Sequence, residues 1–436
     1  MTGPVVAYAG MTHLGLLSGV AAAAQGFQTV CFDPDATRIA ALERGELPVV
    51  EPGLPELLAA NRSRLRITAD PAALAGCDLV YIAPDVPTDD RGISDLSGIE
   101  GLLETVGAAM RKDAVAVILS QVPPGFTRRH PRPDGGPLFY QVETLVFGRA
   151  VERATTPERF IVGCAEPSRP LPPALATFLG SFGCPILPMR LESAELAKIS
   201  INVCLVGSIS VANTLAELCE RVGADWGEIV PALRLDQRIG AHAYLSPGLG
   251  IAGGNLERDL ATVMRLSEAA GTDAGVVRAF VNNSRHRRDW ALRTLHAEVL
   301  GHRRHPVLAV LGLAYKENTA SIKNSPSLAL IDALPAGVTL RLHDPVVPAA
   351  AAGHPGSVQA GSALEACEEA DAVVVMTPWP EFRGIDPAEV ADRMAGRTVI
   401  DPYSVFDPAA AARAGLRHFR LGAPPSSRSE GANSGE

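Results

Sequence analysis

The chain has 436 residues, about three times the length of a typical domain, which predicts two or three domains. Hydrophobic residues make up 47% of it and charged residues 20%, so it can build packed cores and is not a disordered chain. The net charge of -9 argues against a nucleic acid or an anionic membrane as the main partner. We find no apolar run approaching the roughly 18 residues of a membrane span, and no basic signal region.

The seven cysteines are scattered and never form a Cys-x-x-Cys pair. This pattern excludes a disulfide framework or a zinc ribbon, and it predicts the reduced, buried thiols of a cytoplasmic protein without a metal site. Four of them lie outside any glycine-rich loop and are expected to be core thiols and not nucleophiles: Cys164, Cys184, Cys204 and Cys219.

The first part of the chain alternates short apolar runs with helical patterns. Val5–Ala9 and Thr29–Phe32 predict strands on either side of a helix over Leu14–Gln25. A further helix is predicted over Gly98–Ala109, among three more strands: Leu79–Ala83, Ala114–Leu119 and Phe160–Val162. This alternation predicts a doubly wound parallel sheet in a first domain over residues 1–190.

The middle of the chain, residues 191–300, is predicted to be helical. Glu192–Arg221 has apolar residues at helical spacing and no proline, which predicts one long helix. Two more helices, Leu260–Ala270 and Gly275–Ala291, follow a glycine-rich loop at Ser246–Asn255. The apolar stripe of the long helix is too wide for a connector, so we expect it to pack against its two-fold mate in a homodimer. The stripe includes Leu196, Ile199, Val203, Val206, Ile209, Val211 and Leu218.

A second α/β pattern begins at Pro306 and predicts a domain over residues 301–422. Its helix is expected over Ser327–Leu334, and its strands over Val307–Leu311, Val338–Leu342, Ala372–Met376 and Thr398–Ile400. Residues 423–436 are rich in Ser, Gly and Pro and are expected to be disordered. The fold class is therefore α/β, with two Rossmann-like doubly wound domains joined by a long central helix, and the two halves are expected to be loosely similar.

A glycine turn lies between the first predicted strand and helix. Gly10 and Gly15 hold the first and third positions of a G-x-G-x-x-G pattern, whose middle position is Thr12. In a dinucleotide-binding unit such a turn brings the diphosphate to the helix N-terminus, and a carboxylate after the next strand binds the ribose. Asp33 stands at that place and would repel the 2′-phosphate of NADP. The turn predicts NAD binding, with an ordinary βα turn as the alternative.

Eight segments occur in an order and spacing that resembles the UDP-glucose/GDP-mannose dehydrogenase family, from about Val5 to Leu421. They are Glu51–Leu54, Ser120–Thr127, Glu195–Asn202, Asn213–Asp225, Asp236–Gly240, Pro247–Asp259, Gly312–Thr319 and Asp371–Phe382. The resemblance implies an N-terminal NAD domain, a central dimer-building helix and a C-terminal nucleotide-sugar domain. It also implies oxidation of a sugar CH2OH to a carboxylate with two NAD, through a cysteine that traps the aldehyde.

That cysteine is replaced in this chain. The family's loop reads roughly GFGGSCFPKD, and over Gly250–Asp259 Asn255 stands at the cysteine position. An amide nitrogen cannot act as a thiolate. The resemblance and the substitution together predict a single two-electron oxidation, or a transient one.

Other positions of the implied site are retained. Lys198 and Asn202 match residues that hold the sugar oxygen and its developing charge, and Asp259 matches an aspartate that positions water or the reacting hydroxyl. Glu143 falls at a glutamate that acts as a base. Each has a simpler interpretation: a solvated helix face for Lys198 and Asn202, a helix N-cap for Asp259, and a surface position for Glu143.

The predicted cofactor contacts are Gly10, Thr12, His13, Leu14, Gly15, Asp33, Arg38, Pro87, Gln121 and Lys323. The predicted substrate contacts are Arg238, Tyr244, Gly250, Gly253, Tyr315 and Lys316.

The departures from the family pattern are Thr12, Gln121, Phe147, Asn255, Arg258, Lys323 and Tyr403. They leave three hypotheses open: a nucleotide-sugar oxidoreductase limited to one oxidation, an epimerase that retains its NAD, and a non-catalytic nucleotide-sugar-binding relative. The retained Lys198, Asn202 and Asp259 favour catalysis, whereas the substitutions favour the binding-only relative.

Overall fold

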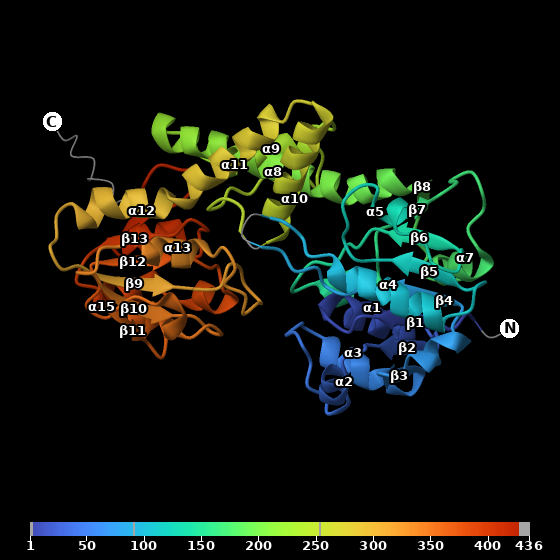
Figure 1. The fold of residues 1–436 in the computed structure, drawn as a ribbon. Coiled ribbons are helices and arrows are strands. Elements are labelled where there is room, and N and C mark those ends of the chain that lie inside the picture. The colour runs from blue at the N-terminus through green and yellow to red at the C-terminus, as the bar shows by residue number, and fades with distance from the viewer. Residues whose placement is uncertain (1–2, 90–91, 253, 427–436) are drawn as a thin grey trace, which may run out of the picture. The chain divides into compact units, whose positions relative to one another are not determined.

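The computed structural model describes residues 3–89, 92–252 and 254–426. The chain divides into two compact units, Met1–Ile201 and Asn202–Glu436. In Figure 1 the first unit runs from blue to green and the second from green to red.

The first unit is built on an eight-stranded sheet in the order β3-β2-β1-β4-β5-β6-β7-β8. Its strands are β1 (Val6–Ala9), β2 (Thr29–Phe32), β3 (Leu65–Thr68), β4 (Leu79–Ile82), β5 (Val115–Ile118), β6 (Leu138–Gln141), β7 (Phe160–Cys164) and β8 (Ile186–Arg190). Neighbouring strands run parallel except β6 and β7, which are antiparallel. The strand order reverses at β1 and β4, and this confirms the predicted doubly wound sheet.

Both faces of this sheet are covered. Along β1, Val6 and Tyr8 enter one hydrophobic core, whereas Ala7 and Ala9 enter the other. Burial on two faces explains why β1 reads as a continuous apolar run instead of an alternating one. The helices of the unit are α1 (His13–Ala24), α2 (Ala36–Glu43), α3 (Leu54–Ala60), α4 (Ser97–Ala109), α5 (Phe126–Arg129), α6 (Ala150–Thr155) and α7 (Pro173–Gly180).

The predicted long helix is present as α8 (Leu191–Val222), with 32 residues. Near its start the buried carboxylate of Glu195 accepts hydrogen bonds from the backbone nitrogens of Gly125, at 2.5 Å, and Thr127, at 2.8 Å.

Among the described residues, α8 is the one helix long and apolar enough to cross a membrane, by length and composition. The helix meets this criterion by average composition only, because polar residues interrupt its apolar runs, as expected from the sequence.

Four helices follow in the second unit: α9 (Trp226–Leu235), α10 (Asn255–Ala270), α11 (Gly275–Arg288) and α12 (Trp290–Leu295). α10 begins five residues before the predicted helix. Its buried Leu260 packs with Val206 of α8 and Val277 of α11 in one small core. The fully buried Arg287 of α11 pairs with Glu220 of α8, at 3.0 Å between Nη2 and Oε1.

The second sheet has six parallel strands in the order β11-β10-β9-β12-β13-β14. The strands are β9 (Val307–Leu311), β10 (Thr339–His343), β11 (Ser357–Gln359), β12 (Ala372–Val375), β13 (Thr398–Ile400) and β14 (Arg417–Phe419). The helices are α13 (Pro326–Asp332), α14 (Ala363–Ala366), α15 (Pro387–Arg393) and α16 (Pro408–Arg413). Two Rossmann-like sheets and a long central helix confirm the predicted fold class.

The expected disordered tail begins with residues that the structure describes as ordered. Ser426 exchanges two backbone hydrogen bonds with His418 of β14, each of 3.0 Å. Residues 427–436 lie outside the described part of the chain.

The cysteines are free thiols, and five of them are buried. Cys184 is partly exposed and Cys204 is exposed on α8, so the expectation of a core thiol is wrong at Cys204. The helical spacing that suggested burial there belongs to its neighbours Val203 and Val206, which pack into the core beside α10.

Candidate functional site

The glycine turn after β1 is built as the sequence predicts. Gly10 has a φ of +99°, and a Cβ at this position would lie 2.7 Å from the backbone nitrogen of Pro84. A Cβ at Gly15 would overlap the carbonyl oxygen of Gly10, so both positions require glycine. The turn brings the N-terminus of α1 to the carboxyl edge of the sheet, between β1 and β4, where ligands of doubly wound folds bind.

Asp33 follows β2 and is only 2% exposed. Its Oδ2 accepts hydrogen bonds from Met11 N, at 2.7 Å, and from Arg38 Nη1, at 2.7 Å. Its Oδ1 accepts from Asp35 N, at 2.9 Å. An ionised carboxylate has about four acceptor positions, so one remains on Oδ1 for a ribose hydroxyl. The turn and the acid fit the adenosine half of NAD, and the structure brings the predicted Arg38 to the same place.

Thr12 is the residue before α1, and its hydroxyl does not cap that helix. Instead Thr12 Oγ1 accepts a hydrogen bond of 2.7 Å from Asp85 N. In return the Asp85 carboxylate accepts one of 2.9 Å from His13 N, the first helical nitrogen. Asp85 was not among the residues predicted from the sequence. The available signal was an acidic residue just after β4, next to the switch point of the sheet.

The His13 side chain points into the protein. Its ring stacks on Phe147, with 4.3 Å between ring centres, and its Nε2 lies 3.5 Å from the buried Glu51 carboxylate. Glu51 also accepts from Gly148 N, at 3.1 Å, and Ala150 N, at 2.7 Å. The side chain of His13 is therefore engaged within the protein, and its backbone nitrogen is the group that lies at the N-terminus of α1. Leu14 is buried in the core beside it.

The remaining predicted cofactor residues are distributed over both units. Pro87, which is exposed, and Gln121, which is half-buried, lie in the loops after β4 and β5, at the same sheet edge as the glycine turn. Lys323 belongs to the second unit, where its side chain lies against Gly254.

Lys198 and Glu143 form an ion pair in the first unit, with 3.0 Å between Nζ and Oε2, and both side chains are largely buried. Glu143 also accepts a hydrogen bond from Leu145 N. Glu143 is thus a partnered residue beside α8 and not a solvated surface position. Its partner, Lys198, is another of the residues predicted for the site.

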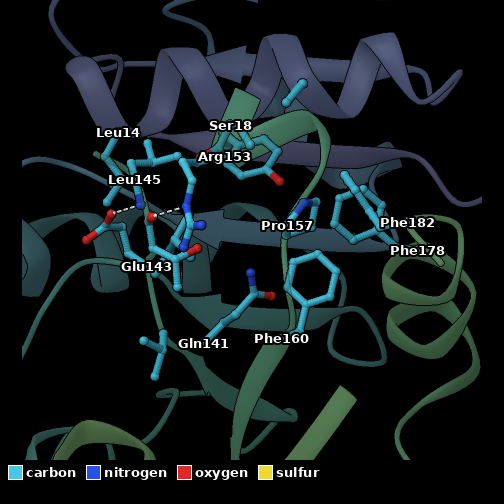
Figure 2. A pocket seen from close by; sticks show the side chains of 16 residues that line it. Leu14, Ser18, Gln141, Glu143, Leu145, Arg153, Pro157, Phe160, Phe178 and Phe182 are labelled. Atoms are coloured by element: carbon cyan, nitrogen blue, oxygen red, sulfur yellow. Dashed lines mark hydrogen bonds between the residues drawn. The ribbon is translucent and has the colours of Figure 1, made fainter. Parts of the chain in front are cut away.

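Glu143 also lines a small cavity on the α1 side of the sheet (Figure 2). The centres of water molecules can occupy about 50 Å³ of it, which is enough for a few waters. Phe160, Phe178 and Phe182 form one end of it, and Arg153 Nε donates to Thr144 O across the other, at 3.4 Å (Figure 2).

Asn202 and Asp259 are buried polar residues of the second unit that are hydrogen-bonded to each other. Asn202 Nδ2 donates to Asp259 Oδ2 at 2.5 Å, and Arg258 Nε donates to Oδ1 at 3.2 Å. Asp259 is 1% exposed and lies in the second turn of α10, whose N-cap is Gly254. The N-cap interpretation of Asp259 is therefore wrong, because α10 begins earlier, at Asn255. Asn255 is exposed in the first turn of that helix.

Glu257 is a further acidic residue that the sequence analysis missed. It is two residues beyond Asn255 and accepts a hydrogen bond from Asn324 Nδ2. Burial raises the pKa of its carboxyl. The contact ties the segment after β9 to the first turn of α10.

Two predicted substrate residues, Gly250 and Gly253, lie in the loop before α10, and the first of them is described by the structure. Gly250 has a φ of +76°, and a Cβ there would lie 2.7 Å from Ser284 Oγ. The same Oγ accepts from Ile251 N at 2.9 Å and so holds the loop to α11. Gly253 lies outside the described residues.

Tyr315 and Lys316 are neighbours in the segment after β9, with Lys316 Nζ 5.6 Å from the Tyr315 ring centre. Burial raises the pKa of Tyr315 to about 12, so its hydroxyl keeps its proton and can donate a hydrogen bond. Tyr244 is exposed, and the exposed Arg238 pairs with Asp236, at 2.6 Å between Nη2 and Oδ2. Desolvation also raises the pKa of the partly buried Tyr403 phenol.

Comparison with known proteins identifies this arrangement. Three domains of one family match along the chain: the NAD binding domain over residues 5–170, the central domain over 192–285 and the UDP binding domain over 309–408. A UDP-glucose 6-dehydrogenase of Pseudomonas aeruginosa is 32% identical over 95% of this chain and 96% of its own length. The chain belongs to the UDP-glucose/GDP-mannose dehydrogenase family.

Other members of the UDP-glucose/GDP-mannose dehydrogenase family agree. UDP-glucose 6-dehydrogenase TuaD of Bacillus subtilis is 29% identical over 96% of this chain and 93% of its own. The solved UDP-glucose dehydrogenase of Pyrobaculum islandicum has a TM-score of 0.84 at 27% identity, over 97% of this chain and 98% of its own. As a member of this family, the protein is an NAD-dependent oxidoreductase that acts on a CH–OH group, and its UDP binding domain indicates a nucleotide-sugar substrate.

Proposed function

We propose that the protein oxidises the CH2OH group of a UDP-sugar by one two-electron step and stops before the carboxylate. The observation that carries this proposal is Asn255 in the first turn of α10, at the position where the family resemblance places the cysteine. UDP-glucose is the first substrate to test, because the Pseudomonas and Bacillus relatives are named for it.

The other thiols do not supply a substitute nucleophile. Burial raises the pKa of Cys31 and Cys367 to about 12 and that of Cys77 to about 11, so these groups stay protonated at neutral pH. Burial also raises the pKa of the Cys164, Cys184 and Cys219 thiols. Cys204 is exposed, and it is two residues from Asn202 on α8, which places it on another side of the helix.

In this proposal, which takes the roles of these residues from the family resemblance, four side chains control the charge of the reacting sugar oxygen. Bound NAD supplies the hydride acceptor. The Lys198 ammonium and the Asn202 amide, one turn apart on α8, donate hydrogen bonds to the oxygen as its negative charge develops. Glu143, paired with Lys198, takes up the hydroxyl proton through a water, and Asp259 fixes the Asn202 amide by accepting its other hydrogen.

A binding-only function is the second candidate, and Arg258 favours it. Its guanidinium donates to Asp259 Oδ1, and Asn202 donates to Oδ2, so both carboxylate oxygens are engaged. Both oxygens of the Asp259 carboxylate are thus held by protein donors, as they would be in a residue with a purely structural role.

The test is incubation with NAD and a panel of UDP- and GDP-sugars, followed by mass analysis of the sugar products. We expect one substrate to lose two hydrogens, and Lys198→Met to lose this activity. The variant Asn255→Cys should form some carboxylate, with Asn255→Ala as the matched control that does not. Binding of a sugar nucleotide without any product would establish the binding-only function instead.

We also propose a cytoplasmic homodimer built on α8. The predicted stripe divides in the structure: Ile199 and Val206 are buried within one protomer, whereas a second row stays exposed. That row is Val211, Leu215, Leu218 and Val222, at helical spacing. Light scattering at micromolar concentration should show a dimer and Leu218→Glu should weaken it, whereas a monomeric native protein would contradict the proposal.

A further inference from the structure

The N-terminus of α1 is engaged by a carboxylate of the protein itself. Asp85 Oδ2 accepts the backbone N–H of His13, the first residue of α1, at 2.9 Å. A dinucleotide diphosphate binds to the same helix N-terminus, for the same reason: the first-turn N–H groups and the helix dipole attract negative charge. Asp85 therefore lies where the cofactor diphosphate has to go.

We propose that Asp85 competes with the diphosphate of NAD for the N-terminus of α1 and thereby lowers the affinity of the protein for its cofactor. Two anions at one backbone donor repel each other strongly, so the Asp85 carboxylate leaves His13 N when the diphosphate binds. Even after it has rotated away, its charge stays close to the diphosphate and weakens the binding further. The inference concerns cofactor binding and holds whichever sugar is oxidised.

The backbone of Asp85 is positioned for this competition. Its N–H donates to Thr12 Oγ1 at 2.7 Å, so the residue is tied to the start of α1 independently of its carboxylate. The Asp85 side chain is exposed and is bound to a backbone nitrogen, so it can turn into solvent while the backbone stays in place. This contact also gives Thr12 a role at the position where the dinucleotide pattern has its middle glycine: its hydroxyl holds the β4 loop.

The position of Asp85 in the sheet supports the same conclusion. β4 ends at Ile82, and β4 is the neighbour of β1 on the side opposite β2. The loop after β4 thus borders the crevice at the switch point, in which ligands of this fold class lie. The acid that binds ribose, Asp33, stands on the other side of β1 and is held by Arg38, so it does not oppose the diphosphate in the same way.

The test measures NAD binding by calorimetry in the native protein and in Asp85→Asn, which keeps the shape of the side chain and removes its charge. We expect NAD to bind on the order of tenfold more tightly to the variant. The affinity for ADP, which carries the same diphosphate, should rise by a similar factor. The matched control is Asp113→Asn, which removes an exposed charge at the opposite, amino edge of the sheet and should leave NAD affinity unchanged.

A purely structural role of Asp85 is separated by thermal unfolding of the same variants without NAD. Competition predicts that Asp85→Asn slightly lowers the melting temperature of the free protein while it tightens NAD binding. Unchanged or weaker NAD binding in Asp85→Asn would overturn the proposal. If that variant does not fold, Asp85→Ala provides the same comparison, and unchanged or weaker NAD binding there would overturn the proposal equally.

Discussion

The two sheets of the molecule repeat one arrangement at the end of their first strand. Gly10 after β1 has a φ of +99° and Gly312 after β9 has one of +95°. Each glycine donates its N–H to the last residue of the neighbouring strand, Gly10 to Phe32 O at 2.9 Å and Gly312 to His343 O at 2.8 Å. The positive φ and the hydrogen bond make the two glycine turns alike. An aspartate also follows the neighbouring strand in each sheet, Asp33 after β2 and Asp344 after β10.

What comes next along the chain differs. α1 begins at His13, directly after the first turn, whereas α13 does not begin until Pro326. Asp344, the counterpart of Asp33, accepts five hydrogen bonds from the protein: from the backbone of Leu313, Ala314, Val346 and Val347 and from the Trp379 indole. Only the first turn therefore offers a helix N-terminus and an acid with a free acceptor position. The glycine makes the turn, and the residues after it decide whether a dinucleotide binds.

The largest loss of stability is expected from a substitution of Asp344. Burial raises its pKa, and four backbone hydrogen bonds outweigh burial and lower it, so the carboxylate is the stabilised form. Asp344→Ala leaves these buried donors unpaired and should cost about 4 kcal/mol of the free energy of unfolding. Urea unfolding followed by tryptophan fluorescence reports this unit selectively, because Trp226, Trp290 and Trp379 all belong to it. A loss below about 1 kcal/mol would show that the five contacts are not important.

The two glycines provide the next comparison. A Cβ at Gly312 would lie 2.6 Å from Thr377 N, and one at Gly10 would lie 2.7 Å from Pro84 N, both at positive φ. Alanine at either position should cost roughly 2 to 3 kcal/mol. Gly10→Ala should also abolish NAD binding, measured by calorimetry, whereas Gly312→Ala should leave it intact. Loss of NAD binding in both variants would mean that the two turns are not functionally distinct.

A smaller effect is expected at Asp33. Asp33→Ala removes the ribose acceptor and the partner of Arg38, and should weaken NAD binding on the order of tenfold, about 1.4 kcal/mol. NADP binding should change less, so the preference for NAD narrows. Equal affinity of the native protein for the two cofactors in calorimetry would contradict the role of Asp33.

The smallest loss of stability is expected from the ion pair between Arg128 and Glu192, at the start of α8. The Arg128 guanidinium, hydrogen-bonded to Glu192, lowers the pKa of that carboxyl from 4.5 to about 2. A lowered pKa in the folded state stabilises above pH 4.5, and this stability is lost as pH falls through about 2. Because both side chains are well exposed, we expect Glu192→Gln to cost only about 0.5 kcal/mol at pH 7.

The pH dependence checks the origin of that effect. Urea unfolding at pH 7 and pH 3 should give a smaller difference between the native protein and Glu192→Gln at the lower pH. Arg128→Met should show the same dependence, since it removes the other half of the pair. A difference that is the same at both pH values would mean that the ion pair is not its source.

The sequence predicts the central strands well because they are buried on both faces. Runs such as Val6–Ala9 and Ala372–Val375 are apolar throughout, and the structure places them as expected. The missed strands β3, β8, β11 and β14 lie at sheet edges and include exposed residues, so their apolar pattern is weak. The internal strand β6 was also missed, because it has only four residues and follows a loop rich in Pro and Gly. The early start of α10 was missed because its first turn carries polar residues.

The candidate site could be predicted where a motif is local. The turn at Gly10 and the acid at Asp33 follow from spacing within one βαβ unit. The bond between Thr12 and Asp85 joins residues 73 positions apart, and no local pattern announces such a pair. Likewise, the engagement of Asp259 by Asn202 depends on how α10 packs against α8, which is a tertiary property.

The central claim is that Asn255 limits the chemistry to one oxidation, and counting electrons tests it most directly. The purified protein is incubated with NAD and the UDP-sugar that it consumes, and NADH absorbance is compared with the sugar product identified by mass. We expect at most one NADH per sugar and an aldehyde-level product, because no thiolate makes the aldehyde tetrahedral for a second oxidation. Two NADH per sugar and a carboxylate product would contradict the account.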